Sequence, residues 1–591
     1  MKRLSWLAAI KTAGLCSLLL MLVLLGGCNG SYPYGEFGPN GSHDVRLDVE
    51  APPVIVLHGI KGAKLARVNN PQNDYKSDQV CPSLAGPSDV TKPLKPVWGY
   101  TGSSGLESTY ERLALYPDPA HLLNDKPWED RQYYAAMDPL KTIKPDKVLT
   151  TFWVGWDVFP VFNFELYGHL VDFLKDEPIN MPIGRRLFLF AYDWRLDNRI
   201  AAILLANCLT HYENNYLNHH AQHVMGLPDS DSSEKTTKRI EQCRDEARKG
   251  STERAVLPSC RERWDKLKAR GAMDSRGNVR FTIVTHSMGG LLARYFADGL
   301  GYKDRVRKLI LFGSPNLGGM DAMRALLEGE HPPTFWHYLG INWLSAADTT
   351  KIHLSFGSLF QLLPRYPKAI VDPQNEHDLT PEFGLSNDDM GAITPQTIAR
   401  WKDLLSFKGV ELDKYKGILD RYLEFQLKSA RCFHLAITDQ AEPCDDEGQR
   451  ITQIREYLQR YYPAVATLHL KGKPQANAPQ KESPYEPPII NFGGQCDKTL
   501  ATMAIEKTIA NEKEILKKVI FLDQEATKPG EQSRWFATST YLVGDNRVPV
   551  KSFDYPHKSR SGDASFLVCK NHVGIIKDEN LLYNLLRAIY Y

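Results

Sequence analysis

The sequence lacks a basic excess, and this absence limits the ligands to consider. Its 72 Lys and Arg residues are almost balanced by 70 Asp and Glu residues, which leaves a formal net charge of +2. Domains that bind nucleic acid usually carry a marked excess of positive charge. We therefore expect no nucleic-acid partner. The remaining composition, 42% hydrophobic and 24% charged, is that of an ordinary globular protein.

The sequence also lacks the ligand spacing of a metal site. It contains no Cys-x-x-Cys pair and no histidine set with zinc spacing. His219, His220 and His223 lie close together, but without carboxylates or cysteines at ligand spacing. We interpret these histidines as the solvated face of a helix, and we expect neither a metal nor a cofactor.

A third absence is a hydrophobic run long enough to span a membrane comfortably. The apolar residues 13–27 follow Lys2, Arg3 and Lys11 and have the charge layout of a secretory signal. The run ends in Leu25-Gly26-Gly27-Cys28, which looks like a bacterial lipobox. This resemblance implies cleavage before Cys28 and attachment of a diacylglyceryl group to it. A plain signal peptide with an incidental cysteine is the alternative.

A lipidated Cys28 predicts where the protein resides. Two or three acyl chains anchor a protein durably, since each buried CH₂ contributes about 0.8 kcal/mol. Asn29 follows the cysteine, and by the rule for such lipoproteins this favours the outer membrane over the inner one. We therefore expect an exported, lipid-anchored bacterial lipoprotein at the outer membrane or the periplasmic face, with membrane lipids as partners and no obligate protein partner.

Cysteines remain after the signal and the anchor are set aside. Ten are present, and removing Cys16 and Cys28 leaves eight (10 − 2 = 8). An even number in an exported chain permits disulfide bonds. The pairs that are closest in sequence, Cys243 with Cys260 and Cys432 with Cys444, are the first candidates.

The residues from 281 to 296 predict a strand, a sharp turn and a helix. Apolar, strand-like residues lead to Ser287, which has small residues after it. The following apolar residues recur at helical spacing: Leu291, Leu292, Tyr295 and Phe296. In an α/β-hydrolase such a turn lifts a nucleophilic serine above the edge of the sheet. The usual pattern has Gly two residues before the serine, where this chain has Thr285, and a buried serine can also be purely structural.

A second loop fits an oxyanion hole. The apolar run from residue 53 to 57 predicts a buried parallel strand that ends in His58-Gly59-Ile60. In hydrolases a His-Gly loop after an early strand supplies one backbone N–H group, and the residue after the nucleophile supplies the other. We assign these roles to Ile60 and Met288. The alternative is that His58 and Gly59 form a simple turn.

Further apolar runs complete a predicted α/β-hydrolase fold with a mostly parallel central sheet, a large cap and insertions. Strands are expected at 186–192, 306–312, 539–543 and 564–569, and helices at 164–174 and after Asp578. The expected segments are a signal peptide (1–27), a flexible tether (28–50), the first part of the core (51–319, with an insertion at about 205–275), a cap or lid (320–535) and the closing part of the core (536–591).

A serine needs a base and an orienting carboxylate to act as a nucleophile. In the α/β-hydrolase fold these residues follow in the order Ser, Asp, His. Asp545 after a late strand and His572 before the last helix fit this order. The remaining alternatives are Asp554 or Asp563 for the acid and His557 for the base.

Six motifs stand out along the chain: Val56-Leu-His-Gly-Ile-Lys-Gly-Ala-Lys-Leu65, Ala191-Tyr-Asp-Trp-Arg-Leu196, His286-Ser-Met-Gly-Gly290, Ser358-Leu-Phe-Gln-Leu-Leu-Pro364, Gly544-Asp-Asn-Arg-Val-Pro549 and Asn571-His-Val-Gly574. In this order they resemble the lecithin:cholesterol acyltransferase family, which includes lysosomal phospholipase A2 and phospholipid:diacylglycerol acyltransferase. The resemblance implies that Ser287, Asp545 and His572 form the triad and that a phospholipid acyl ester is attacked. The chain departs from the family at Thr285, at His58, where many members have Pro, and in its longer insertion and cap.

These observations predict a serine-dependent lipid acyl-ester hydrolase or O-acyltransferase that acts through an acyl-serine intermediate. Two alternatives stay open. One is a triacylglycerol lipase or general esterase, and the other is a catalytically silent surface lipoprotein that binds lipid or a protein.

Overall fold

The computed structural model describes residues 52–67, 81, 95–98, 115, 143–156, 159–176, 179–224, 238, 265–274, 277–329, 346–374, 377–387, 392–408, 418–438, 444, 447–461, 485–510, 513–522, 543–553 and 563–590. The predicted signal peptide, Cys28 and the tether lie outside these residues.

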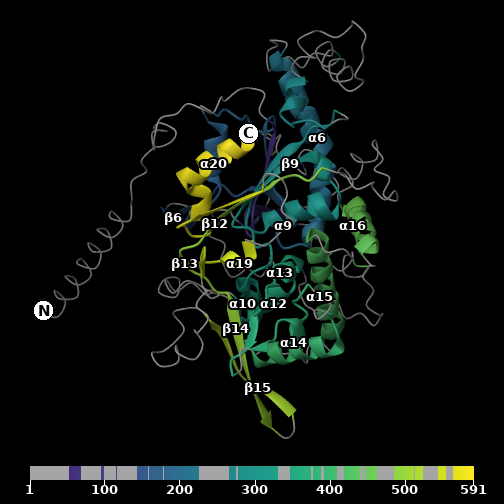
Figure 1. Ribbon diagram of the computed structural model, residues 1–591, viewed down its shortest axis with the longest axis vertical. Coiled ribbons are helices and arrows are strands. Elements are labelled where there is room, and N and C mark those ends of the chain that lie inside the picture. Colours follow the sequence, from purple (N-terminus) through teal and green to yellow (C-terminus); the bar gives the residue numbers. More distant parts are fainter. Residues whose placement is uncertain are drawn as a thin grey trace, which may run out of the picture. The chain divides into compact units, whose positions relative to one another are not determined.

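A six-stranded sheet forms the centre of the fold (Figure 1). Its order is β17-β12-β9-β8-β1-β7, and every neighbouring pair is parallel. The strands are β1 (Val54–Leu57), β7 (Leu187–Phe190), β8 (Phe281–His286), β9 (Val306–Phe312), β12 (Ile489–Gly494) and β17 (Ala564–Val568). The inner strands are apolar and buried because parallel sheets are covered on both faces. The predicted parallel α/β fold is confirmed.

Helices follow several of these strands and pack on the sheet. Helix α9 contacts β1, β8 and β9, and α20 contacts β9. The longer helices are α5 (Gly168–Lys175), α6 (Asn198–Val224), α9 (Gly289–Arg294), α10 (Met320–Glu328), α12 (Ala346–Leu354), α14 (Pro395–Phe407), α15 (Ile418–Ile437), α16 (Glu447–Tyr461) and α20 (Glu579–Tyr590). Short helices are α13 (Gly357–Gln361) and α19 (Val550–Phe553), and a π-helical turn, η3 (Tyr295–Gly299), extends α9.

Smaller antiparallel elements lie outside the central sheet. Strands β2 (Ala63–Arg67), β3 (Lys95–Trp98) and β4 (Ile143–Val148) form one sheet, and β5 (Thr151–Trp156) pairs with β6 (Phe159–Glu165). Strands β10 (Ile370–Asp372), β11 (His377–Asp378), β14 (Thr502–Ala510) and β15 (Lys513–Leu522) form another, and β13 (Asp497–Lys498) pairs with β16 (Val543–Gly544).

Three sequence predictions need correction. The region 320–535 is not entirely a cap, because β12 within it pairs with β9 and β17 in the central sheet. The strand predicted at 539–543 does not close that sheet: Val543 and Gly544 pair with β13, and 539–542 lie outside the described residues. The helix predicted at 164–174 begins only at Gly168, because β6 occupies 159–165. The other predicted domain boundaries stay predictions.

Other predictions agree with the structure. Asp578 caps α20 by accepting the N–H of Leu581 at 3.1 Å. The disulfide Cys432–Cys444 is confirmed, and Cys81–Cys208 and Cys496–Cys569 are further disulfides. Cys243 and Cys260 lie outside the described residues. Within the described ranges, no helix is long and apolar enough to cross a membrane.

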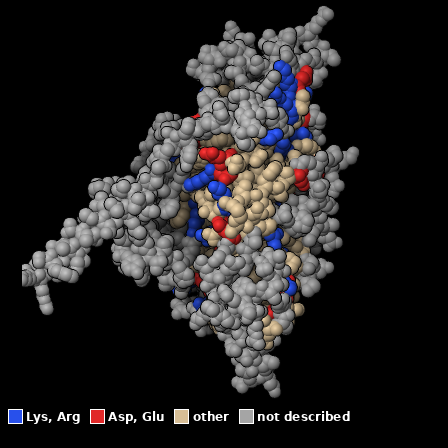
Figure 2. Space-filling model, turned by 60° about the vertical axis from the view of Figure 1, so that its left-hand side comes forward, with Lys and Arg blue, Asp and Glu red and all other residues tan. Residues whose placement is uncertain are grey.

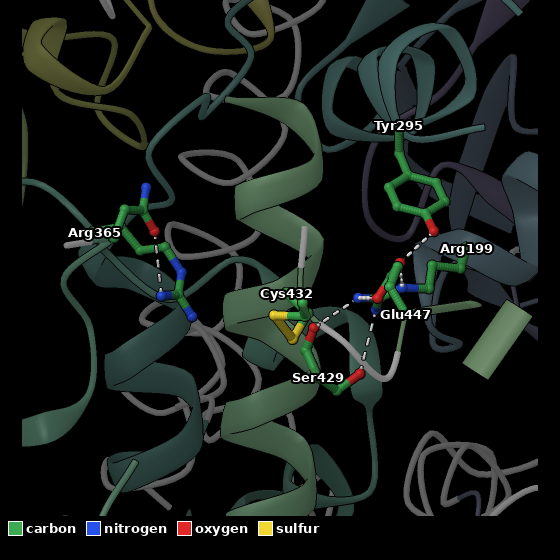
Figure 3. The surroundings of a disulfide bond; sticks show 8 residues. Arg199, Tyr295, Arg365, Ser429, Cys432 and Glu447 are labelled. Carbon is green, nitrogen blue, oxygen red and sulfur yellow. Dashed lines mark hydrogen bonds and ion pairs between the residues drawn. A yellow bond between two sulfur atoms is a disulfide. The ribbon is translucent and has the colours of Figure 1, made fainter. Parts of the chain in front are cut away.

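In the described chain, charged residues lie both on the surface and inside the protein. On the face drawn in Figure 2, side chains of both signs lie around an area formed by other residues, in keeping with the balanced composition. Inside the protein, Arg199 of α6 lies against Glu447 of α16 and Tyr295 of η3, beside the disulfide of Cys432 (Figure 3). This buried ion cluster joins helices that are far apart in sequence.

Candidate active site

Ser287 occupies a strained turn between β8 and α9. Its φ angle is +55°, in the left-handed region that residues with a side chain rarely adopt. Its backbone N–H donates to the carbonyl of Phe312 at 2.8 Å, at the end of β9. The residue is 8% exposed. A strained serine between a strand and a helix at the carboxyl edge of a parallel sheet is the geometry of a nucleophile elbow.

The glycines after Ser287 are required by close packing. A Cβ atom at Gly289 would lie 2.6 Å from the carbonyl oxygen of His58. A Cβ atom at Gly290 would lie 2.0 Å from Oγ of Ser314 and 3.3 Å from Oγ1 of Thr285. The absence of side chains at these glycines lets α9 lie directly on the neighbouring strand ends.

Asp545 and His572 form a hydrogen-bonded pair. Nδ1 of His572 lies 2.7 Å from Oδ2 of Asp545, and the N–H of His572 donates to the carbonyl of Asp545 at 2.7 Å. The other carboxylate oxygen accepts the N–H groups of Arg547 (3.0 Å) and Val548 (2.7 Å). Asp545 is fully buried. Because a carboxylate only accepts hydrogen bonds, the pair places the proton of His572 on Nδ1 and leaves Nε2 as the basic nitrogen.

Ser287 and the Asp545–His572 pair both lie against the end of β9. Ser287 bonds to Phe312, and the next residue is Gly313. A Cβ atom at Gly313 would lie 2.9 Å from Oδ2 of Asp545 and 3.0 Å from Nδ1 of His572. The structure therefore brings all three predicted triad residues to the same edge of the sheet.

The alternative acid and base are placed differently. Asp563 accepts the N–H of Ile489 at 2.7 Å, at the start of β12 and so at the opposite edge of the sheet. Asp554 and His557 lie outside the described residues. Among the three candidates for the acid, Asp545 has a histidine partner in the described chain.

The loop after β1 lies against the serine. A Cβ atom at Gly59 would be 2.7 Å from Cβ of Ser287. The carbonyl of Gly59 accepts Nδ1 of His58 at 2.7 Å and the N–H of Gly62 at 3.1 Å. Because a peptide unit is planar and trans, fixing this carbonyl also fixes the direction of the N–H of Ile60. Met288, the other predicted oxyanion donor, is the N-cap residue of α9, and its N–H group has no partner within the helix.

Burial keeps His58 neutral. It lowers the pKa of His58 to about 4. Its Nε2 accepts the N–H of Tyr192 at 3.1 Å, which leaves Nδ1 as the donor to Gly59. The ring also stacks on that of Tyr192 at 4.0 Å between centroids. His58 thus braces the loop.

The Tyr-Asp-Trp-Arg element supports this loop from behind. Arg195 forms two bonds to the carboxylate of Asp193, at 2.9 and 2.6 Å, and both residues are buried. The indole of Trp194 donates to the carbonyl of Ala63 at 3.3 Å. The described contacts of these three residues are with the framework, which gives this motif a structural role.

Sequence reasoning missed two residues next to the triad. Tyr167 hydrogen-bonds to Gly59 and to His286, and His286 hydrogen-bonds to the main chain of His572. His286 was noticed only as part of the elbow motif. Tyr167 belongs to no motif, and its partners lie 108 and 119 residues away in sequence.

Within the described ranges, no group of three or more His, Cys, Asp or Glu residues could hold a metal ion. His219, His220 and His223 lie on α6. The serine, the histidine, the carboxylate and nearby N–H groups lie together at this edge.

The parallel sheet, the serine turn and the Asp–His pair define an α/β-hydrolase fold. The family model described as lecithin:cholesterol acyltransferase matches residues 258–432. The predicted resemblance to this family is thereby confirmed over the segment that contains Ser287. The match ends before Asp545 and His572.

Among solved structures, the chain is similar to "The crystal structure of Tle4-Tli4 complex", with 12% sequence identity and a TM-score of 0.41. The similarity covers 91% of this chain and 98% of that one. A search of curated proteins found no significant match.

Proposed function

We propose that the protein is a serine-dependent lipid acyl-ester hydrolase or O-acyltransferase. The observation that carries this proposal is the 2.7 Å contact between Nδ1 of His572 and Oδ2 of Asp545. This pair and the strained Ser287 both lie against residues 312–313 at the end of β9. The family match over residues 258–432 supports a lipid ester as the substrate.

The proposed reaction has two halves. Oγ of Ser287 attacks the ester carbonyl carbon while Nε2 of His572 takes its proton, and Asp545 stabilises the resulting imidazolium. The N–H groups of Ile60 and Met288 donate to the oxyanion. The alcohol leaves with the proton from His572, and an acyl group remains on Ser287. Water or a lipid alcohol then attacks this acyl-serine by the same steps in reverse.

The test is turnover of a p-nitrophenyl ester and of a defined phospholipid by wild type and Ser287→Ala. In a well-studied serine hydrolase, losing the serine costs about 10⁶ in kcat, so we expect no measurable turnover by the variant. Ser406→Ala, at an exposed position of α14, is the control and should match wild type. Full turnover by Ser287→Ala would refute the proposal.

A fluorophosphonate probe separates an enzyme from a silent lipoprotein. We expect it to label wild type and Ser406→Ala but not Ser287→Ala. Folded wild type that is neither labelled nor active would favour a protein that only binds lipid. Mass spectrometry of the products, with and without an added sterol or diacylglycerol, identifies the acyl acceptor. Faster cleavage of triglycerides or short esters than of phospholipids would favour the lipase alternative.

We also propose that the protein is anchored through a lipidated Cys28 and acts on membrane lipids from outside the inner membrane. The lipobox-like residues 25–28 support this. The mature N-terminal peptide should begin at Cys28 and carry the added mass of acyl chains. An unmodified cysteine would refute the anchor without affecting the proposed activity.

A further inference from the structure

Three hydrogen bonds connect the loop after β1 with the main chain of the proposed base. The N–H of Gly59 donates to Oη of Tyr167 at 2.8 Å. Oη of Tyr167 lies 2.9 Å from Nδ1 of His286, and Nε2 of His286 lies 2.8 Å from the carbonyl oxygen of His572. Tyr167 and His286 are 1% and 4% exposed, so water does not compete for these bonds.

The partners fix the direction of every proton in this connection. A carbonyl oxygen only accepts, so Nε2 of His286 carries a proton and donates it to His572. The neutral ring then has a bare Nδ1, which accepts the hydroxyl proton of Tyr167. The Tyr167 oxygen in turn accepts the N–H of Gly59. Each donor has one acceptor, and one tautomer of His286 satisfies all three bonds.

Burial keeps His286 in the form that this arrangement requires. Burial first, and the nearby His572 next, lower the pKa of His286 to about 3. A protonated ring would turn Nδ1 into a donor, and the hydroxyl proton of Tyr167 would lose its acceptor. His286 therefore stays neutral in any assay near neutral pH and does not itself exchange the reaction's proton.

We infer that Tyr167 and His286 are positioning residues. They hold the loop after β1 that contains Gly59 and Ile60, the oxyanion loop, in a fixed position relative to His572. This inference rests on the proposed function, because it concerns the same site. The hydroxyl of Tyr167 accepts the N–H of the peptide unit before Gly59, and the carbonyl of the same unit accepts the hydroxyl of Tyr192 at 2.6 Å. Nδ1 of His58 donates to the carbonyl of the peptide unit after Gly59. Together they orient the N–H of Ile60. His286 also directly precedes Ser287, so the connection spans loop, nucleophile and base.

The position of this loop should matter more for the transition state than for substrate binding. An oxyanion donor acts on charge that develops only as the tetrahedral intermediate forms. Removing one such donor costs about 10²–10³ in kcat. A residue that only orients the donor should cost less, and we expect a loss of about 10-fold or more when the loop is released.

The test compares kcat and KM of Tyr167→Phe with those of wild type. The variant keeps the ring and removes only the hydroxyl. Tyr485→Phe is the matched control, because its hydroxyl donates to the carbonyl of Arg307 at 2.9 Å, at the other end of β9. We expect Tyr167→Phe to lose about 10-fold or more in kcat with KM within about twofold of wild type. Tyr485→Phe should keep the wild-type kcat.

If Tyr167→Phe does not fold, a second pair of variants tests the same inference. His286→Gln can still donate and accept through its amide, whereas His286→Leu can do neither. We expect His286→Gln to keep a larger kcat than His286→Leu. Both residues act through the same connection, so combining Tyr167→Phe with His286→Leu should reduce kcat by less than the product of the single effects.

Two outcomes distinguish the inference from the proposal on which it rests. If wild type is labelled by fluorophosphonate and active, but Tyr167→Phe and His286→Leu stay within twofold of its kcat, the positioning role is wrong and the proposed function stands. If folded wild type is itself unlabelled and inactive, both fail. A loss that appears equally in Tyr485→Phe would also overturn the inference, since any lost hydroxyl would then have the same effect.

Discussion

Replacing Glu447 by Ala should cost a large part of the stability of the helical region. Glu447 accepts Nε and Nη2 of Arg199 at 2.7 and 2.9 Å and the hydroxyl of Tyr295 (Figure 3). Arg199 is fully buried. Removing one partner of a buried ion pair typically costs about 3–5 kcal/mol, because the other charge stays buried. Arg199 retains Asp197 at 3.1 Å, so we expect the lower end, about 3 kcal/mol.

The measurement is the free energy of unfolding from urea titration at pH 7. The control is Glu424→Ala, which removes an exposed carboxylate of α15 that pairs with Lys428 at 2.6 Å. Exposed helical pairs of this kind contribute about 0.3–0.5 kcal/mol. If Glu447→Ala costs no more than Glu424→Ala, the reasoning about the buried ion cluster is wrong.

The same carboxylate gives a pH dependence with a definite sign. Burial disfavours the charged form of Glu447, but Arg199 and Tyr295 outweigh it and hold its pKa below the ordinary value of 4.5. A folded pKa below the unfolded one stabilises the protein above the unfolded pKa, and this stabilisation is lost as the pH falls through the folded pKa. The stability difference between wild type and Glu447→Gln should therefore be constant from pH 7 to about 5 and shrink below that pH.

Two further predictions concern the site. Asp545→Asn should lower kcat by about 10⁴, as the same change does in a well-studied serine protease, because an amide facing Nδ1 of His572 favours the wrong tautomer. Steady-state kinetics on a p-nitrophenyl ester test this, and a loss below tenfold would argue for a different acid. Gly59→Ala should lower kcat at least about tenfold, because its Cβ would lie 2.7 Å from Cβ of Ser287 and push the oxyanion loop away. Gly448→Ala, where nothing lies within 4 Å, is its control and should leave kcat unchanged.

The strands could be predicted where a short apolar run ends at a recognisable loop. The runs at β1, β8 and β9 are each followed by small or charged residues, and buried parallel strands have this pattern. β12 was missed because it directly follows Pro487 and Pro488 at the end of a Pro-rich stretch. It also has only three large apolar residues, Ile489, Ile490 and Phe492, which are too few to show a strand pattern.

The triad residues of the site could be predicted, because chain order and motifs point to them. The order Ser, Asp, His fits Ser287, Asp545 and His572 but left other candidates open, and the resemblance of the motifs implied these three. The fold brings them to one edge because parallel strands end there together. Tyr167 could not be predicted, because hydrogen bonds between residues more than 100 positions apart leave no local pattern. The pattern also could not reveal that the Tyr-Asp-Trp-Arg element hydrogen-bonds to His58 and Ala63 on the two sides of the loop after β1.

Thr285 shows how a departure from a motif can be accommodated in three dimensions. The usual Gly at this position leaves space next to the nucleophile turn, and a threonine adds a methyl and a hydroxyl group there. In this chain the hydroxyl of Thr285 lies within 3.4 Å of the carbonyl of Ile310 and is directed toward β9. The space it needs is provided from α9 by Gly290, where a side chain would meet both Thr285 and Ser314. The steric requirement of the elbow thus applies to the contact between β8, β9 and α9, and in this chain Gly290 satisfies it.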